Sequence, residues 1–320
     1  MNKASGRWAS CAALVGLTVA ATSLSAQDRD SGALVERLAA MTAVSGYEQS
    51  LTDSLLRLLP GSKKDRTGNV ILVKGDGEPR RLIACGVDEP GYVVGGLRDD
   101  GWLTLKRVAF TSDPLFDQQL EGQRITVFGR NGAVPGVVAV RSTHLSRGRS
   151  GADEPFNIDA AYVDVGASTA ADIEKLGISV LAPVALTKRP HRYGTDLVAA
   201  PSIGRRSACA ALIRAALSAR PAAGRTVIAF TVEGLFTGRG LSSLGTTAGP
   251  FAQTVFVGAA AGAAREQLIS PDTALASPGL GAVSRWDLPV RYAGSPVETV
   301  SLEDVSNLAA RLQALMEKSQ

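Results

Sequence analysis

Histidine, cysteine and aromatic side chains are all scarce in this sequence of 320 residues. It contains two histidines, His144 and His191, three cysteines and 5% aromatic residues. Two imidazoles leave little material for a metal centre that relies on nitrogen ligands. Hydrophobic residues still make up 45% of the chain and charged residues 20%. This composition excludes a disordered chain and is typical of one large globular domain or two smaller ones.

Several catalytic motifs are also missing. The sequence has no Gly-x-Ser-x-Gly turn, no His-Glu-x-x-His pair and no phosphate-binding loop, and the glycine-rich segment 238–245 lacks the lysine of a nucleotide site. A covalent mechanism through Cys85 is conceivable, because this residue ends an apolar strand-like run. Its flanks are apolar, however, and no histidine can be assigned as its partner, which argues against a reactive thiolate.

The excess of positive charge is small. The net charge of +4 falls to +2 without Lys3 and Arg7, since no acidic residue precedes position 27. A basic patch for nucleic acid or for an anionic membrane surface is therefore not expected.

Residues 1–26 have the order of a secretory signal peptide. Lys3 and Arg7 precede an apolar run from Trp8 to about Ala21, and small residues follow up to Ala26. The alternative is an uncleaved membrane anchor, because Leu24 stands where a small residue is usual, but the run is short and interrupted by Thr and Ser. We expect a periplasmic or secreted protein that starts near Gln27 and has no membrane contact after cleavage.

Two cysteines, Cys85 and Cys209, remain after that cleavage. They could pair in an oxidising compartment. A chain of this length needs no disulfide framework, however, and both residues lie in apolar segments typical of buried free thiols. Buried thiols are the expectation, with a disulfide as the alternative.

Hydrophobic periodicity predicts an α/β domain. Segments 31–41, 51–59, 207–220 and 301–318 have helical spacing, the last with Ser301 and Asp304 as a capping pair. Apolar, β-rich runs occupy 69–75, 81–87, 225–233 and 253–260, and the first two, separated by the turn Asp-Gly-Glu-Pro, suggest a hairpin-like pair.

Short strands divided by Asp-Gly and Asn-Gly turns fill the middle of the chain. The runs at 91–97, 102–108, 123–129 and 136–140 predict a small β-barrel or sandwich. We therefore expect an inserted β-rich domain at 91–190, within an α/β domain formed by 27–90 and 191–320.

Short blocks along almost the whole mature chain resemble the glutamyl/tetrahedral aminopeptidase family. They are SGYE (45–48), DRTGN (65–69), VDEPG (87–91), PGVV (135–138), HL (144–145), YVDVGAS (162–168), FTV (230–232) and RYAGSPVE (291–298). The resemblance implies a zinc-exopeptidase-like (phosphorylase/hydrolase-like) mixed-sheet domain with an inserted, barrel-like β domain that mediates homo-oligomers. It also implies two divalent metals held by imidazoles and carboxylates, with a free carboxylate as general base.

The positions that the resemblance assigns to these groups carry other residues here. In ACGVDEPG, Gly86 stands where the first ligand, a histidine, is expected, while Asp88 and Glu89 are kept. In SIGRRSACAAL, Gly204 and Arg205 stand in place of two acids, one of them the bridging ligand.

The second half of the site shows the same pattern. In FTVEGLFTGRG, Gly234 replaces the general base and Leu235 a ligand, and the next strand offers Gly258 or Ala259 for a further Asp. Gly294 replaces the last histidine. The resemblance also places a further strand and helix between Gly258 and RYAGSPVE, and the roughly three dozen residues available there predict that this element is deleted.

Two readings follow from these replacements. A non-catalytic homologue with no metal cofactor and a binding or assembly role fits the loss of every ligand, because clustered carboxylates are tolerable only beside cations. The alternative is an active metal-dependent aminopeptidase that uses Asp88, Glu89 and Glu233 as displaced ligands for zinc, which requires the three acids to converge. His144 and His191 are expected to be surface or loop residues in either case.

Three arginines give the emptied site a basic character. Arg205, Arg206 and Arg239, with Asp88, form a candidate pocket for a peptide carboxylate or another small anion, because guanidinium forks suit carboxylates. The alternative is that these arginines are solvated or structurally paired. The family's assembly predicts a homo-oligomer, or a structural partner of an active homologue.

Overall fold

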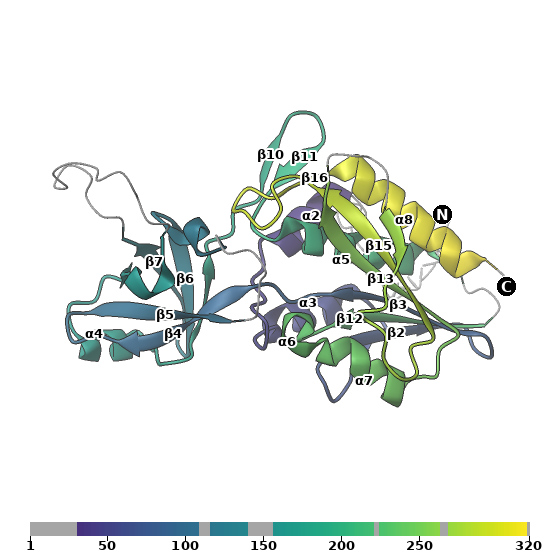
Figure 1. Cartoon of the computed structure of the whole chain (residues 1–320), viewed down its shortest axis with the longest axis horizontal. Coiled ribbons are helices and arrows are strands. Elements are labelled where there is room, and N and C mark those ends of the chain that lie inside the picture. The colour runs from purple at the N-terminus through teal and green to yellow at the C-terminus, as the bar shows by residue number, and fades with distance from the viewer. Residues whose placement is uncertain (1–30, 109–115, 140–155, 221–223, 263–267, 319–320) are drawn as a thin grey trace, which may run out of the picture.

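The computed structural model describes residues 31–108, 116–139, 156–220, 224–262 and 268–318. The expected signal peptide, Cys11 and His144 lie outside these residues. The larger part of the molecule is an α/β layer structure and the smaller part is a β-barrel beside it (Figure 1).

A seven-stranded mixed sheet forms the centre of the larger part. Its central strands are buried apolar runs, as parallel strands covered on both faces must be. Its strand order is β1-β2-β12-β3-β13-β15-β14, with β12, β3, β13 and β15 parallel to one another. The strands are β1 (Lys63–Lys64), β2 (Val70–Lys74), β12 (Arg225–Thr231), β3 (Arg80–Gly86), β13 (Gln253–Ala261), β15 (Ala282–Val290) and β14 (Leu268–Pro271).

The predicted pairing of β2 with β3 is wrong, although the chain does reverse between them. Strand β12 lies between the two, antiparallel to β2 and parallel to β3. The turn motif indicates that the chain reverses direction, but it does not determine which strands pair. The apolar side chains of β3 are buried on both faces of the sheet, which makes a position between two parallel neighbours the better one.

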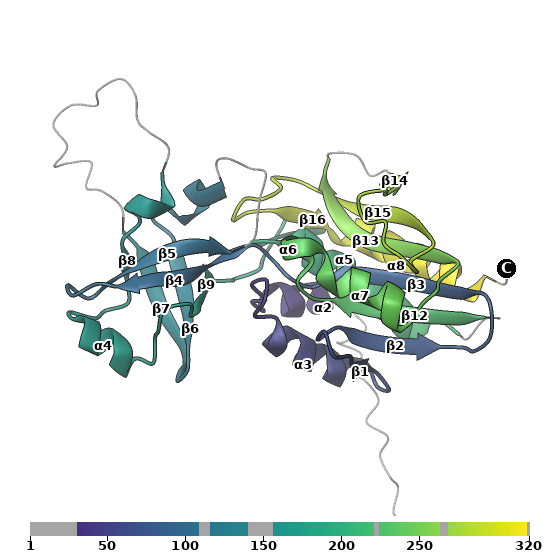
Figure 2. The ribbon, with the colours of Figure 1, turned by 60° about the horizontal axis from the view of Figure 1, so that its bottom comes forward.

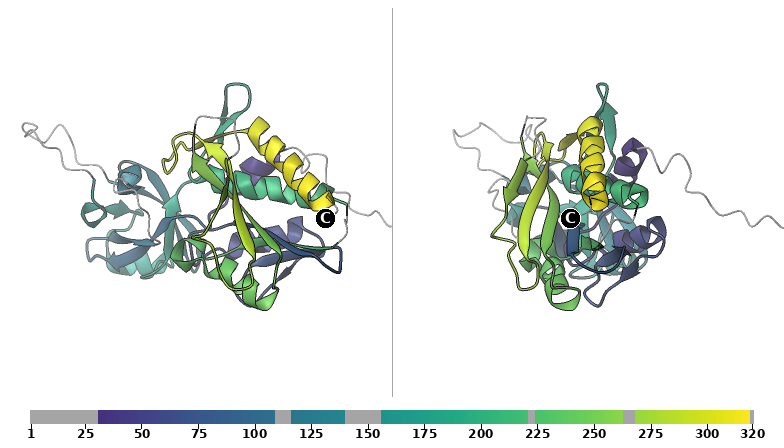
Figure 3. Two further views of the ribbon diagram at one scale, coloured as in Figure 1. Left: turned by 45° about the vertical axis from the view of Figure 1, so that its right-hand side comes forward. Right: turned by 90° about the vertical axis from the view of Figure 1, so that its right-hand side faces the viewer.

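Helices cover the two faces of this sheet. Four of them, α2 (Ser31–Ala39), α3 (Gln49–Leu58), α5 (Ile203–Ser218) and α8 (Leu302–Glu317), share one core with Ile83 and Cys85 of β3. The opposite face, which carries Leu82 and Ala84, packs against α7 (Arg239–Thr247). The short helix α6 (Gly234–Thr237) precedes α7, and Figures 2 and 3 show these layers from other sides.

A disulfide joins β3 to α5, so the expectation of two buried free thiols is wrong. Cys85 and Cys209 are bonded with their Cα atoms 5.6 Å apart and 124 residues apart in sequence. Both residues are buried in the same core, at 0% and 3% exposure. The apolar flanks correctly indicate burial, but only the packing of α5 on the sheet brings the two sulfurs together.

The segment between β13 and RYAGSPVE contains more secondary structure than predicted. Strand β15 runs parallel to β13, and β14 pairs with its outer edge. The expectation that a strand is deleted here is therefore wrong. In the described part of this segment no helix lies between β13 and β15.

The β-rich middle closes into a six-stranded barrel in the order β4-β5-β8-β7-β6-β9. Its strands are β4 (Gly91–Leu97), β5 (Trp102–Val108), β6 (Arg124–Gly129), β7 (Gly132–Val138), β8 (Val163–Asp164) and β9 (Pro183–Leu186). The helix α4 (Ala170–Lys175) and the 3-10 turns η1 (Phe116–Leu120) and η2 (Ile158–Ala160) lie between them in sequence. The predicted fold class, a mixed α/β domain with a β-rich barrel, is confirmed.

The seven-stranded sheet and its covering helices are called the sheet domain below. A small third sheet lies beside this domain. It contains β10 (His191–Tyr193), β11 (Leu197–Ala199) and β16 (Thr299–Ser301), and the exposed ring of His191 stacks on Tyr193. Helix α8 follows β16 and begins with the predicted cap, in which the Asp304 amide donates to the Ser301 hydroxyl. Among the described residues, no helix has the length and hydropathy needed to span a membrane.

The disulfide predicts a measurable stabilisation of the mature chain. In a chain that starts at Gln27, Cys85 and Cys209 are the two cysteines, so alkylation of the denatured, unreduced protein should add no mass. Replacing both with Ala should lower the free energy of unfolding by about 2–4 kcal/mol, measured by urea denaturation. Two alkylated cysteines before reduction would contradict the bond.

Candidate functional site

The segment that leaves β3 for the barrel carries the two acids retained in the resemblance. Strand β3 ends at Gly86, and β4 begins at Gly91. Asp88 and Glu89 lie between them and are 0% and 1% exposed. Buried carboxylates are costly unless cations or hydrogen-bond donors compensate them. The surroundings of these two acids therefore define the site.

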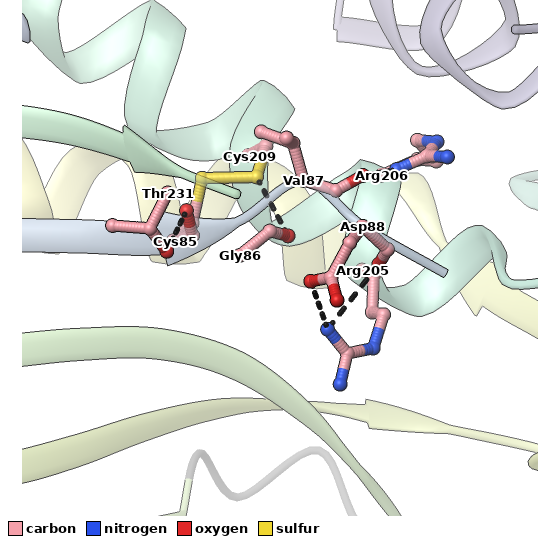
Figure 4. Close-up of a disulfide and its surroundings, with 8 residues drawn as sticks. All are labelled: Cys85, Gly86, Val87, Asp88, Arg205, Arg206, Cys209 and Thr231. Carbon is pink, nitrogen blue, oxygen red and sulfur yellow. Dashed lines mark hydrogen bonds and ion pairs between the residues drawn. A yellow bond between two sulfur atoms is a disulfide. The ribbon is translucent and has the colours of Figure 1, made fainter. Parts of the chain in front are cut away.

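Asp88 is held by three different parts of the chain. The Ser45 hydroxyl donates to its Oδ2 at 2.5 Å, and the Leu235 amide donates to the same atom at 2.7 Å. Arg205 of α5 supplies the opposite charge, with Nη1 at 3.4 Å from Oδ1 and 3.3 Å from the main-chain oxygen (Figure 4). These last two contacts are long for hydrogen bonds.

Glu89 belongs to a separate and fully buried ion cluster. Its Oε2 accepts from the Lys188 ammonium, and Arg206 Nη2 lies 2.9 Å from the same oxygen. The Ala43 amide donates to Oε1 at 2.9 Å. Burial raises the pKa of Glu89, but the two cations more than offset this and leave it below the ordinary value. Burial lowers the pKa of Lys188 from 10.5 to about 8, partly opposed by Glu89.

Arg205 and Arg206 are neighbours in α5, but their guanidinium groups point in different directions (Figure 4). Arg206 is 1% exposed and also donates to the Val87 oxygen. The Arg205 side chain is 32% exposed. Arg206 thus serves the buried cluster, whereas Arg205 faces the solvent-accessible cleft.

Glu298, the last residue of RYAGSPVE, binds two main-chain amides. The Gly204 amide donates to Oε1 at 2.7 Å and the Gly294 amide donates to Oε2 at 2.9 Å. Burial raises the pKa of Glu298, against the opposing effect of these two bonds. The carboxylate therefore ties the start of α5 to the loop before β16.

The glycines that the resemblance places at ligand positions give room to charged groups. A Cβ at Gly86 would lie 3.2 Å from Arg205 Nη1, and one at Gly234 would lie 3.0 Å from Asp88 Oδ1. At Gly258 it would lie 2.7 Å from Arg285 Nη2. The small residues and the charged side chains thus occupy one continuous neighbourhood.

Glu233 and Arg239 lie at the edge of this neighbourhood. Arg239 Nη1 is 3.0 Å from Glu233 Oε2, and the arginine side chain is 63% exposed. The Glu233 amide donates to Glu48 Oε1 at 2.9 Å, and Glu233 itself adopts a left-handed backbone with φ of 51°. Glu48 is buried, and desolvation raises its pKa.

Each acid of the alternative reading therefore has its own cation: Arg205 for Asp88, Lys188 and Arg206 for Glu89, and Arg239 for Glu233. No group of three or more His, Cys, Asp or Glu side chains suited to a metal ion occurs among the described residues. Of the four residues of the candidate pocket, Asp88 and Arg205 are brought together at the cleft. Arg206 is buried behind them, and Arg239 is on the surface.

Two adjoining cavities border Arg205: one lies between the sheet domain and the barrel, and the other lies within the sheet domain. The larger has a volume of about 340 Å³ and is lined by barrel residues such as Tyr92 and Phe116 and, from the sheet domain, by Arg205, Glu298 and Gly294. The smaller, of about 150 Å³, is lined by Gly86, Gly234, Gly258, Arg205 and Arg285. Arg205 and Ala259 border both cavities.

Sequence reasoning missed three residues of this site. Lys188 follows the apolar strand β9 and resembles any charged residue after a strand, and Glu298 was noticed only as part of a motif. Arg285 lies in β15, which was not predicted. Lys188 stands between Thr187 and Arg189 in a polar, basic run, so the sequence offered no signal of its burial.

The lowered pKa of Lys188 predicts a pH-dependent stability. Between about pH 8 and pH 10.5 the unfolded chain binds the Lys188 proton and the folded chain does not, so the unfolding free energy should rise with pH in that window. The Lys188→Met variant should lack this rise, measured by denaturant unfolding along the pH range. Lys175→Met is the control, since Lys175 is exposed in α4. A difference between wild type and Lys188→Met that stays constant with pH would contradict the assignment.

Comparison with known proteins identifies the relatives of this chain. The sequence profile of the M42 glutamyl aminopeptidases matches residues 68–242, more than half of the chain. SgcX of Escherichia coli (strain K12) is 30% identical over 178 residues, 53% of this chain and 46% of that protein. The lysyl aminopeptidase of Pyrococcus furiosus is 28% identical over 172 residues, 51% of this chain and 49% of that protein. The chain thus spans about half the length of these curated relatives.

Solved structures share the fold over a longer stretch. The TET1 peptidase of Pyrococcus horikoshii, which can assemble into a tetrahedron or a large octahedral shell, matches with a TM-score of 0.81 at 20% identity. The match covers 90% of this chain and 100% of that one. An aminopeptidase from Desulfurococcus kamchatkensis matches with a TM-score of 0.77 at 18% identity, over 90% and 94% of the two chains. These structures confirm the mixed α/β fold with its barrel, and by its sequence profile the chain belongs to the M42 glutamyl aminopeptidase family.

Proposed function

We propose that this protein is a catalytically inactive member of the M42 family with a binding or assembly role. The observation that carries the proposal is the pairing of each acid at the end of β3 with a cation of the chain itself. Asp88 faces Arg205, and Glu89 faces Lys188 and Arg206. A divalent cation would have to displace these groups and would then share a buried space with their positive charges.

The residues present do not fit the metals that the family resemblance implies. Glycines stand at positions assigned to a histidine and to carboxylates, and a glycine has no ligand atom in its side chain. The space next to Gly86 and Gly258 is taken by the guanidinium groups of Arg205 and Arg285. We therefore derive no catalytic step through a metal in this chain.

Export is part of the proposal. A buried disulfide between Cys85 and Cys209 forms and persists most readily in an oxidising compartment. It supports a periplasmic or secreted location, in agreement with the signal-peptide pattern of residues 1–26.

An assembly role is supported by a structural neighbour. The TET1 peptidase can assemble into a tetrahedron or a large octahedral shell. We extend this to the present chain as a proposed homo-oligomer, which light scattering on the mature protein would test.

The proposal predicts that the mature protein binds no stoichiometric metal. After equilibration with excess Zn²⁺ or Co²⁺ and gel filtration, a tag-free chain starting at Gln27 should retain below about 0.1 equivalent per chain, measured by mass spectrometry. Aminoacyl-p-nitroanilides of acidic, basic and apolar residues should not be hydrolysed above the rate of a metal-only blank. The matched control is Glu233→Gln, which should change neither result.

Two metal equivalents per chain, or hydrolysis that is lost in Glu233→Gln, would overturn the proposal. Either outcome would restore the reading of an active aminopeptidase with displaced ligands.

A further inference from the structure

The carboxylates that line the larger cavity are compensated by cations or amides of the chain, whereas guanidinium donors remain available there. Glu89 is neutralised by Lys188 and Arg206, and Glu298 binds two amides and has a raised pKa. Neither carboxylate is left as a strong partner for an ammonium group. A peptide that entered with its free amine first would therefore lose hydration there without gaining an ion pair.

Arg205 has the opposite character. Its side chain is 32% exposed, and within the described chain its hydrogen bonds are the two long contacts of Nη1 with Asp88. The Nε and Nη2 donors of this planar fork are thus available for a carboxylate, which an arginine binds in a bidentate manner. Arg206 and Arg285 add to the positive potential around it.

The beginning of α5 contributes to the same potential. This 16-residue helix has no acidic residue in its first turn, and its N-cap residue, Ser202, makes no side-chain cap bond. Pro201, Ser202 and Arg205 all line the larger cavity. The positive end of the helix dipole therefore faces the space next to the Arg205 fork. Glu298 occupies the Gly204 amide there.

Apolar side chains also line the larger cavity. Tyr92, Phe116 and Leu186 of the barrel side face Leu235 and Val290 of the sheet domain across it. A volume of about 340 Å³ is enough for a group of the size of a dipeptide. The larger cavity thus offers both a guanidinium group and apolar side chains to a ligand.

We infer that this cleft binds a ligand with a terminal carboxylate and an apolar body, such as the C-terminal end of a peptide, with Arg205 as the anchor. The polarity is the reverse of that of an aminopeptidase, which acts at the amino end of its substrate. This inference rests on the proposed loss of catalysis, because a working metal centre would need the space next to Gly86 and Gly258 that the arginines occupy.

The first test compares three probes on the wild-type protein by calorimetry in EDTA. They are N-acetyl-Leu-Leu with a free carboxylate, its C-terminal amide, and Leu-Leu-amide with a free amine. The acid should bind at least about tenfold more tightly than either amide. Equal binding of the acid and the acetylated amide, tighter binding of the free amine, or no binding of the acid at about 10 mM would overturn the inference.

The second test uses variants. Arg205→Met should weaken binding of the acid by at least about tenfold and abolish its preference over the amide, whereas Arg205→Lys should keep a part of it. Arg239→Met is the matched control, because this arginine lies outside both cavities and pairs with Glu233. An unchanged acid preference in folded Arg205→Met would also overturn the inference.

Two further probes separate the possible sources of the carboxylate. Octanoate supplies the same terminal group without peptide bonds, and tighter binding of octanoate than of the peptide acid would assign the site to free fatty carboxylates, contradicting the peptide example. Inorganic phosphate that displaces the peptide acid at equal concentration would show a general anion site and overturn the carboxylate assignment. Because all measurements are made in EDTA, their outcome is independent of the metal content that tests the proposed function.

Discussion

Two carboxylates buried at the end of one strand set the requirements for the rest of this site. Asp88 and Glu89 are buried where the chain leaves the sheet for the barrel, so their charges must be balanced nearby. The chain does this with Arg205, Arg206 and Lys188, which come from α5 and from the connection after the barrel. Gly86 leaves space for the head group of Arg205, and Gly234 leaves space for the carboxylate of Asp88. The small residues at these positions thus fit the charged groups around them.

Much of the fold was predictable from local patterns. Continuous apolar runs marked β3, β12 and β13, and alternating short strands with Gly-containing turns marked the barrel. Pairing was less predictable, because the turn between β2 and β3 specifies a reversal and not the strand that lies between them. The disulfide was not predicted for the same reason: its two cysteines are brought together by the packing of α5.

The residues of the site were likewise predictable only in part. The resemblance located Asp88, Glu89 and the glycines, because these follow motif positions along the chain. It gave no orientation for the arginines, so Arg206 and Arg239 were grouped with Arg205, although one is buried with Glu89 and the other is on the surface. Lys188 and Arg285 were missed because neither lies in a motif. Their roles arise from contacts across the molecule, which spacing in sequence does not encode.

The pair formed by Glu89 and Lys188 also has a mechanical consequence. Glu89 lies on the connection that enters the barrel, and Lys188 lies on the connection that leaves it. This buried ion pair connects the two segments that join the barrel to the sheet domain. Rotation of the barrel away from the sheet would separate these charges in a medium of low polarity. The ion pair therefore opposes rotation of the barrel relative to the sheet.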